Sequence, residues 1–376
     1  MVHIPGFQDL LCIYESNKSR IFRARREQDN LPVVLKALRE DNDSSHEIAR
    51  YQQEVKILSS LGARPGIIQT LGQGESRGAP FIVLEDFGAD SLKSWVDRRA
   101  FSLVEKLALA ARMASGIAEI HAAHVIHKDI NLTNVVYNPE TDTLKLIDFG
   151  LSTLLTRECP EIQGLDGLEG TLACISPEQT GRMNRTIDFR TDFYSLGASL
   201  YQLFTGRLPF EQDDLLELVH CHLARQPALP HEICPEIPPV VSAIVARLMA
   251  KTPEDRYQSA QGIQQDFLRC LKLLREQGRA SSFALGQRDV PEQLTIPQKL
   301  YGREQELEVL SAAFARVAAG TRELTLVAGP SGVGKTALVR ELNKTLTEQR
   351  GYLSAASSTP SSRTSPTARW PRPSGS

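Results

Sequence analysis

The feature that most constrains the fold of this chain is a set of five polar side chains separated by long stretches of ordinary sequence. They are Lys36 in VVLKAL, Glu54, Asp129 and Asn134 in HKDINLTN, and Asp148 in LIDFG. One cation, three carboxylates and one amide together can bind the phosphates of a nucleotide and a hard divalent cation. Residues so far apart act together only if the fold brings them to one cleft, so the set predicts a large, compact domain.

The pattern of apolar residues divides this domain into two parts of different class. The front predicts short strands at 10–16, 19–26 and 32–39, a helix at 46–62 that ends at Gly62, and a buried strand within 79–88. From about Ser102 the apolar residues recur at helical spacing. This rear part predicts one long helix and further helices at about 191–206, 212–224, 238–250 and 257–275. We therefore expect an α+β domain of two lobes, 8–87 and 88–275.

The five polar residues fit the requirements of phosphoryl transfer. Lys36 is the candidate cation for the nucleotide phosphates, and Glu54 would hold it through an ion pair. Asp129 is the candidate base beside the attacking hydroxyl. Asn134 and Asp148 supply hard oxygen ligands of the kind that Mg²⁺ prefers. Each residue alone has an ordinary explanation as a solvated surface group, but their order and spacing make the set specific.

In this order the motifs resemble the protein kinase family over about residues 8–275, and later segments support the resemblance. Residues 176–178, Ser-Pro-Glu, stand where the family has Ala-Pro-Glu, and Asp192 stands at the start of its large central helix. The resemblance implies that Arg256 pairs with Glu178. It also implies that Thr171 is the threonine that serine/threonine kinases keep beside the catalytic aspartate. A two-lobed protein kinase fold follows as the expected architecture.

The resemblance further implies ATP and Mg²⁺ as cofactors and a serine or threonine of a protein as the acceptor. Residues 84–87 would form the hinge, where the backbone groups of Glu85 and Phe87 bind adenine. Small-molecule kinases of the aminoglycoside and choline type share part of the pattern. They generally lack the Ser-Pro-Glu segment and the partners Asp192 and Arg256, so we disfavour them.

Three departures from the family pattern affect the expected chemistry. Tyr14, Ser16 and Ser19 occupy the positions of the phosphate-covering glycines, so their side chains should hold this ATP-binding loop further from the phosphates. Asn131 replaces a catalytic lysine and brings hydrogen bonds without charge. Lys128 replaces an arginine and loses the bidentate fork that would clamp a phosphorylated activation loop. A pseudokinase scaffold without phosphotransfer is therefore the alternative to an active kinase.

The departures and a second motif resemble one bacterial class, in which a eukaryotic-like serine/threonine kinase is fused to a P-loop (AAA-type) ATPase module. The segments IPGF, HKDIN and SPEQTGRMNR carry the resemblance within the kinase part. Beyond a linker at 276–300, residues 301–352 predict the first fragment of an α/β P-loop NTPase. Its glycine loop runs from Gly329 to Gly334 between a strand and a helix, followed by Lys335 and Thr336.

The last part of the chain, 353–376, predicts a disordered tail that arises from a shifted reading frame. It has no acidic residue, no strand-like alternation and a strong Ser/Thr/Pro bias. Codons can be chosen for this tail that encode FIRGKFDPFQQDIPYRALAQAFRL in another frame, which resembles the continuation of the ATPase module. We expect a C-terminally truncated module with an incomplete ATPase site.

Composition excludes several other classes. A net charge of -2 gives no general attraction to nucleic acid, and no apolar run is long enough to span a membrane. The six cysteines lack a C-x-x-C pair, which is typical of reduced thiols in the cytoplasm. The histidines and cysteines between 220 and 234 fit no zinc spacing. We expect a cytoplasmic protein whose partners are ATP and a protein substrate.

Overall fold

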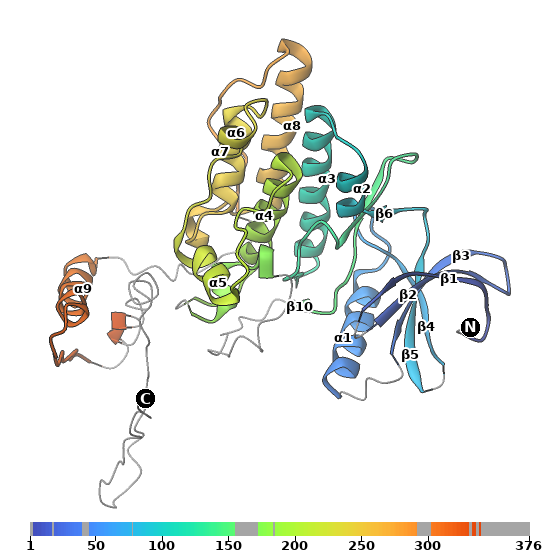
Figure 1. Ribbon diagram of the computed structural model, residues 1–376, viewed down its shortest axis with the longest axis horizontal. Helices are drawn as coiled ribbons and strands as arrows, with labels where there is room; N and C mark the ends of the chain where they lie inside the picture. The colour runs from blue at the N-terminus through green and yellow to red at the C-terminus, as the bar shows by residue number, and fades with distance from the viewer. Residues whose placement is uncertain are drawn as a thin grey trace, which may run out of the picture.

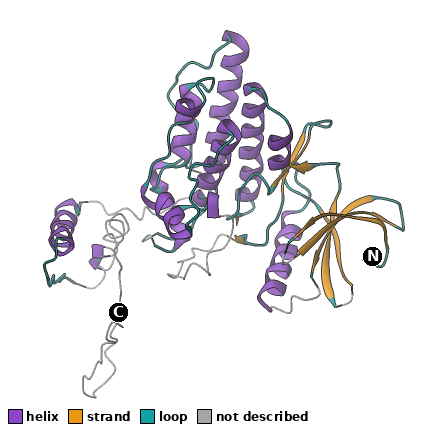
Figure 2. Ribbon diagram, viewed as in Figure 1, coloured by secondary structure: helices purple, strands orange, loops and turns teal. Residues whose placement is uncertain are grey.

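The computed structural model describes residues 3–16, 19–39, 45–76, 78–154, 172–182, 185–291, 302–330, 333–335 and 338–339. Within them, strands gather at one end of the domain and helices at the other (Figure 1, Figure 2). This is the predicted α+β arrangement of a β-sheet lobe and a helical lobe. Among the described residues, no helix is long and apolar enough to cross a membrane.

The N-lobe is a five-stranded antiparallel sheet with one helix, α1 (Ser45–Leu61), beside it (Figure 1). The strands follow the order β1-β2-β3-β5-β4. Their bounds are Phe7–Glu15, Ser19–Arg26, Pro32–Leu38, Thr70–Ser76 and Ala79–Glu85 for β1 to β5. Four of these strands match the predictions, with boundaries shifted by up to three residues. Strand β4 was not predicted, because TLGQGES has two glycines and no apolar alternation.

The C-lobe is built around α3 (Leu103–Ala122), which is buried along one face, and α4 (Arg190–Thr205), which is almost completely buried. Ser102 caps α3 and forms a capping box with Glu105, and Gly206 ends α4 in a left-handed conformation. The surrounding helices are α2 (Leu92–Arg98), α5 (Leu215–Ala224), α6 (Pro230–Ile233), α7 (Pro239–Leu248) and α8 (Ala260–Gln277).

Short strands and 3₁₀ turns complete the C-lobe. Strands β6 (Asp90–Ser91), β8 (Val135–Asn138) and β9 (Thr143–Leu146) form a small sheet, and β7 (Val125–Ile126) pairs with β10 (Thr153–Leu154). The 3₁₀ turns are η2 (Leu172–Cys174), η3 (Pro177–Thr180) and η4 (Pro253–Asp255). These elements bracket the segments that contain Asp129 and Asp148.

The predicted linker at 276–300 begins with residues that are packed on the C-lobe. Helix α8 continues to Gln277, and Asp289 lies buried against the start of that helix. Its carboxylate accepts hydrogen bonds from the backbone N–H groups of Gln258 and Ser259 and forms an ion pair with Arg247 at 3.0 Å. The described residues up to 291 thus extend the C-lobe beyond the predicted boundary at 275.

The predicted strand ahead of the P-loop is wrong for the described residues. The segment contains α9 (Glu304–Ala318), but residues 321–330 form no strand. Leu324 is 99% exposed and Leu326 is 89% exposed. A buried parallel strand needs neighbours on both edges, and no described residue of this segment supplies one.

We predict that Asp289→Ala lowers the free energy of unfolding of the full chain by about 2 kcal/mol. The substitution removes hydrogen bonds from a helix N-terminus and the partner of Arg247. Urea denaturation followed by circular dichroism measures the change. Glu276→Ala is the matched control, since the ion pair of Glu276 with Lys272 is exposed, and we expect a change within about 0.5 kcal/mol. Equal effects of the two substitutions would contradict the prediction.

Candidate active site

Lys36 points from the N-lobe sheet toward α1. Val33 and Leu35, its neighbours at alternate positions of β3, are fully buried on one face of the sheet, so Lys36 emerges on the other. Its Nζ lies 2.8 Å from Glu54 Oε2 and 2.9 Å from Asp148 Oδ1. The structure thus brings together three of the five residues that the sequence singled out.

Electrostatics in this triad favour the charged form of Lys36, which faces two carboxyl groups with a single positive charge. Burial alone would lower the pKa of Lys36, but the nearby carboxylates Asp148 and Glu54 raise it above the usual value. The Lys36 charge holds the pKa of Asp148 below its ordinary value, whereas burial raises the pKa of Glu54. The side chain of Asp148 is 44% exposed, so its carboxylate remains open to a further cation.

A buried carboxylate, Asp192, shapes the loop that contains Asp129. Asp192 accepts hydrogen bonds from the backbone N–H groups of His127 (2.9 Å) and Lys128 (2.8 Å), and it lies 2.8 Å from His121 Nε2. Burial would raise the pKa of Asp192, but the hydrogen bond with His121 contributes to holding it below its ordinary value. Lys128 has a positive φ of 68°, a costly backbone conformation for a residue with a Cβ atom.

Asp129 is held by two amide side chains. Asn131 Nδ2 donates to Asp129 Oδ1 at 3.0 Å, and Asn134 Nδ2 donates to Asp129 Oδ2 at 3.0 Å. The oxygen of the Asn131 side-chain amide is also held, because this Oδ1 accepts hydrogen bonds from the backbone N–H groups of Thr133 and Asn134. Asn131 therefore organises the loop around Asp129.

Asn134 and Asp148 fit a magnesium ion by the chemistry of their free oxygens. Because Asn134 turns its Nδ2 to Asp129, its Oδ1 remains as an oxygen ligand. Asp148 has an exposed carboxylate with a lowered pKa and a positive φ of 64°. An amide oxygen and a carboxylate are hard donors that suit Mg²⁺. No cluster of three or more His, Cys, Asp or Glu residues suited to a metal occurs among the described residues.

The hinge residues use their side chains for structure. The Glu85 carboxylate accepts from the backbone N–H of Gln69 and pairs with Lys145, and the backbone N–H of Glu85 donates to the Gln69 carbonyl, so neither of these groups is left for adenine. The carbonyl of Phe87 accepts from Asn138 Nδ2 at 2.6 Å. Sequence reasoning missed Asn138, because an asparagine in NPETD is what any turn would contain.

The glycine-free loop between β1 and β2 is closed by its own serines. The Ser16 N–H donates to the Ser19 carbonyl at 2.9 Å, and the Ser19 N–H donates to Ser16 Oγ at 3.1 Å. Tyr14, at the first glycine position, is 57% exposed. Both serines thus have local partners within the loop.

The predicted pair of Glu178 and Arg256 is present and buried. Arg256 Nη1 and Nη2 lie 2.6 and 2.8 Å from the two carboxylate oxygens of Glu178, and both side chains are at most 1% exposed. Burial would raise the pKa of Glu178, but the Arg256 charge leaves it below its ordinary value. The pair joins η3 to the turn after η4, and Thr191 at the start of α4 also donates to Glu178.

Some predicted site residues lie elsewhere or outside the described residues. Thr171 and Thr336 are not among the described residues. In the P-loop segment, Lys335 Nζ donates to the carbonyls of Gly329 and Pro330 at 2.9 and 2.7 Å. Gly334 has a φ of 89°, which a residue with a side chain rarely adopts. The roles assigned to this loop stay predictions.

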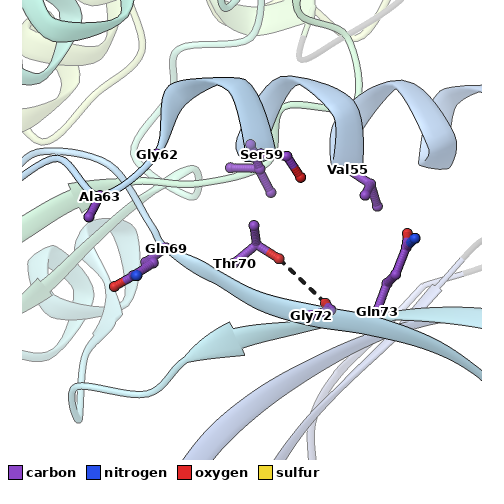
Figure 3. Close-up of a pocket in the computed structure, with 9 residues that line it drawn as sticks. Val55, Ser59, Gly62, Ala63, Gln69, Thr70, Gly72 and Gln73 are labelled. Carbon is purple, nitrogen blue, oxygen red and sulfur yellow. Dashed lines mark hydrogen bonds between the residues drawn. The ribbon is translucent and has the colours of Figure 1, made fainter.

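A cavity of about 380 Å³ lies between α1 and β4 and is separate from the catalytic residues. Figure 3 shows Val55 and Ser59 pointing from the helix toward the strand. The lining residues are all uncharged: Val55, Leu58, Ser59, Gly62, Ala63, Gln69, Thr70, Gly72 and Gln73. Because no cationic side chain lines the cavity, it is unsuited to phosphate. It lies close to the active site in sequence, since its lining residue Val55 directly follows Glu54 on α1.

Comparison with known proteins agrees with this geometry. The protein kinase domain family matches residues 15–268, and the AAA ATPase domain family matches residues 299–370. The first match covers well over half of the chain. The chain belongs to the protein kinase family. An AAA ATPase segment follows the kinase domain, and its match continues past the predicted boundary at 352.

The kinase domain is similar to curated kinases of several organisms. It is 32% identical to serine/threonine-protein kinase pkn3 of Myxococcus xanthus over 66% of this chain and 47% of that protein. It is 28% identical to serine/threonine-protein kinase PknB of Mycolicibacterium smegmatis over 67% of this chain and 40% of that protein. A segment of 192 residues is 39% identical to hybrid signal transduction histidine kinase G of Dictyostelium discoideum, over 45% of this chain and 6% of that protein. The chain spans less than half the length of each of these relatives.

We predict that Arg256→Met destabilises the kinase domain by about 3–5 kcal/mol at pH 7.5 and by less at pH 5.5. The substitution leaves the buried Glu178 carboxylate without its partner. In the native protein the pKa of Glu178 lies below its value in the unfolded chain. The stability that the ionised Glu178 contributes is therefore fully present at both pH 5.5 and pH 7.5. Without Arg256, burial raises that pKa, and protonation at the lower pH relieves the penalty.

Urea denaturation at the two pH values measures this difference. Combining Arg256→Met with Glu178→Gln should recover a large part of the loss, because no buried charge remains. A penalty that is the same at both pH values, or that grows toward pH 5.5, would contradict the assignment.

Proposed function

We propose that the kinase domain transfers the γ-phosphate of ATP to serine or threonine hydroxyls of a protein. The observation that carries the proposal is the assembled triad, in which Lys36 Nζ contacts both Glu54 and Asp148 within 3 Å. Lys36 would bind the nucleotide phosphates, with Glu54 fixing its direction. Asn134 and Asp148 would hold Mg²⁺, which when bound neutralises charge on the phosphates. The similarity to bacterial serine/threonine kinases supports the acceptor class.

Asp129 would act on the acceptor hydroxyl. Both oxygens of its carboxylate accept an amide hydrogen bond, and a carboxylate is by its chemistry an acceptor that can take up a proton. The hydroxyl oxygen attacks the γ-phosphorus, the bond to the ADP oxygen breaks, and the hydroxyl proton passes to Asp129. Asn131 keeps this carboxylate oriented but supplies no positive charge for the transferred phosphate. We infer an enzyme with a higher ATP requirement than a kinase with a catalytic lysine and a glycine-rich loop.

A nucleotide-binding pseudokinase is the second candidate, because Ser16 and Ser19 close the loop that would cover the phosphates. In either case we propose that the chain acts in the cytoplasm, where ATP and Mg²⁺ are available, and in bacterial signalling. The AAA segment would belong to a larger regulatory protein, as in the fused class that the sequence resembles.

We predict that Asp129→Asn lowers kcat for phosphate incorporation by about 10²–10⁴-fold and changes ATP affinity by less than about twofold. The amide cannot accept the proton, but it keeps the shape and leaves Lys36 in place. Radiolabelled ATP with a generic protein substrate measures transfer, and a fluorescent ATP analogue measures binding. Asp97→Asn, at an exposed position of α2, is the matched control and should behave as wild type. Equal transfer by wild type and Asp129→Asn would establish the pseudokinase instead.

A further inference from the structure

Gln179 links η3 to the backbone of the loop that contains Asp129, residues 127–134, which we call the catalytic loop. It follows Glu178 in η3, and its Nε2 donates to the carbonyl oxygen of Lys128 at 2.8 Å. Its Oε1 accepts from the backbone N–H of Ser176 at 3.0 Å, and the Ser176 hydroxyl lies 3.0 Å from the same atom. The amide has one consistent orientation, because a backbone N–H only donates and a carbonyl only accepts.

The position of Lys128 makes this contact important. Lys128 directly precedes Asp129 and has the left-handed φ of 68°. Its own N–H is held by Asp192 at 2.8 Å, which fixes the peptide group on its N-terminal side. Gln179 holds the carbonyl of the next peptide group, whose N–H belongs to Asp129 and lies 3.3 Å from His127 Nδ1. Hydrogen bonds therefore hold the peptide groups on both sides of Lys128, one to Asp192 and the other from Gln179.

The anchor on the Gln179 side belongs to a network that reaches the buried ion pair. The Ser176 hydroxyl lies 3.4 Å from Thr191 Oγ1, and Thr191 donates to Glu178 at 2.8 Å. Ser176 and Thr191 are both fully buried. An alanine at position 176 would lack this hydroxyl but keep its backbone N–H, so the contact between Gln179 and Lys128 does not require the serine side chain.

We propose that Gln179 is a positioning residue that keeps Asp129 in its catalytic orientation by holding the Lys128 backbone against η3. The proposal rests on the proposed kinase function. Without the hydrogen bond from Gln179, Lys128 can relax from its left-handed φ, and the Asp129 carboxylate can leave the place set by Asn131 and Asn134. Nucleotide binding through Lys36 is not involved, so the effect falls on turnover.

Two substitutions of Gln179 test the proposal in the full chain. Gln179→Glu keeps the acceptor for Ser176 but has no N–H for Lys128, and Gln179→Met removes both contacts at similar length. We expect each to lower kcat about tenfold, the rate equivalent of one hydrogen bond, with the KM for ATP changed less than about twofold. Ser176→Ala, which retains the Lys128 contact, should keep kcat within about twofold of wild type.

Hydrogen exchange provides a readout that does not depend on activity. Mass spectrometry should show faster amide exchange in residues 127–134 of both Gln179 variants, and wild-type exchange there in Ser176→Ala. Unchanged exchange and kcat in the Gln179 variants would overturn the proposal. So would a loss of kcat accompanied by an equal loss of ATP affinity and thermal stability, or an equal effect of Ser176→Ala.

The outcomes separate this proposal from the proposed function. If wild type transfers no more phosphate than Asp129→Asn, the kinase function fails. Exchange in residues 127–134 then still decides whether Gln179 holds the Lys128 backbone. If wild type is active and the Gln179 variants match it, only the positioning role fails.

Discussion

The geometry of the catalytic loop depends on one buried carboxylate. Asp192 is inaccessible to solvent, and it receives the N–H groups of His127 and Lys128 together with the ring of His121. A buried carboxylate without such donors would be costly, so the helix that carries it is stable only with the loop in place. The same contacts hold the peptide group on the N-terminal side of Lys128, which has a left-handed conformation, and Asp129 after it meets Asn131 and Asn134. The hydrogen bonds that satisfy the buried Asp192 are therefore also the ones that hold the catalytic loop.

A second constraint joins the two lobes. Lys36 belongs to the N-lobe sheet and Asp148 follows a C-lobe strand, yet their side chains meet beside Glu54 of α1. Each group is unfavourable alone: Glu54 is buried, and Lys36 loses hydration. Their mutual contact offsets these costs and defines one relative position of the lobes. A cation beside Asp148 or a phosphate beside Lys36 would compete for the same contacts, which couples ligand binding to lobe geometry.

Much of the fold and of the site could be predicted from sequence because those parts rest on local patterns or on residues with few chemical alternatives. The long helices follow apolar spacing, and the pairing of Arg256 with Glu178 follows a recognisable motif. Other features depend on tertiary contacts that leave no local signal. Strand β4 has no alternation, and Asn138 resembles any turn residue until Phe87 is found beside it.

The departures at Asn131 and in the loop after β1 follow one physical pattern. In both places a side chain that satisfies hydrogen bonds within the protein replaces a group whose usual partner is phosphate. Asn131 donates to Asp129 and accepts from Asn134, and Ser16 closes its own hairpin with Ser19. Such replacements stabilise the ligand-free site but leave less interaction for the nucleotide. In the proposed function, the phosphate charge would then fall mainly on Lys36 and on the cation that Asn134 and Asp148 would hold.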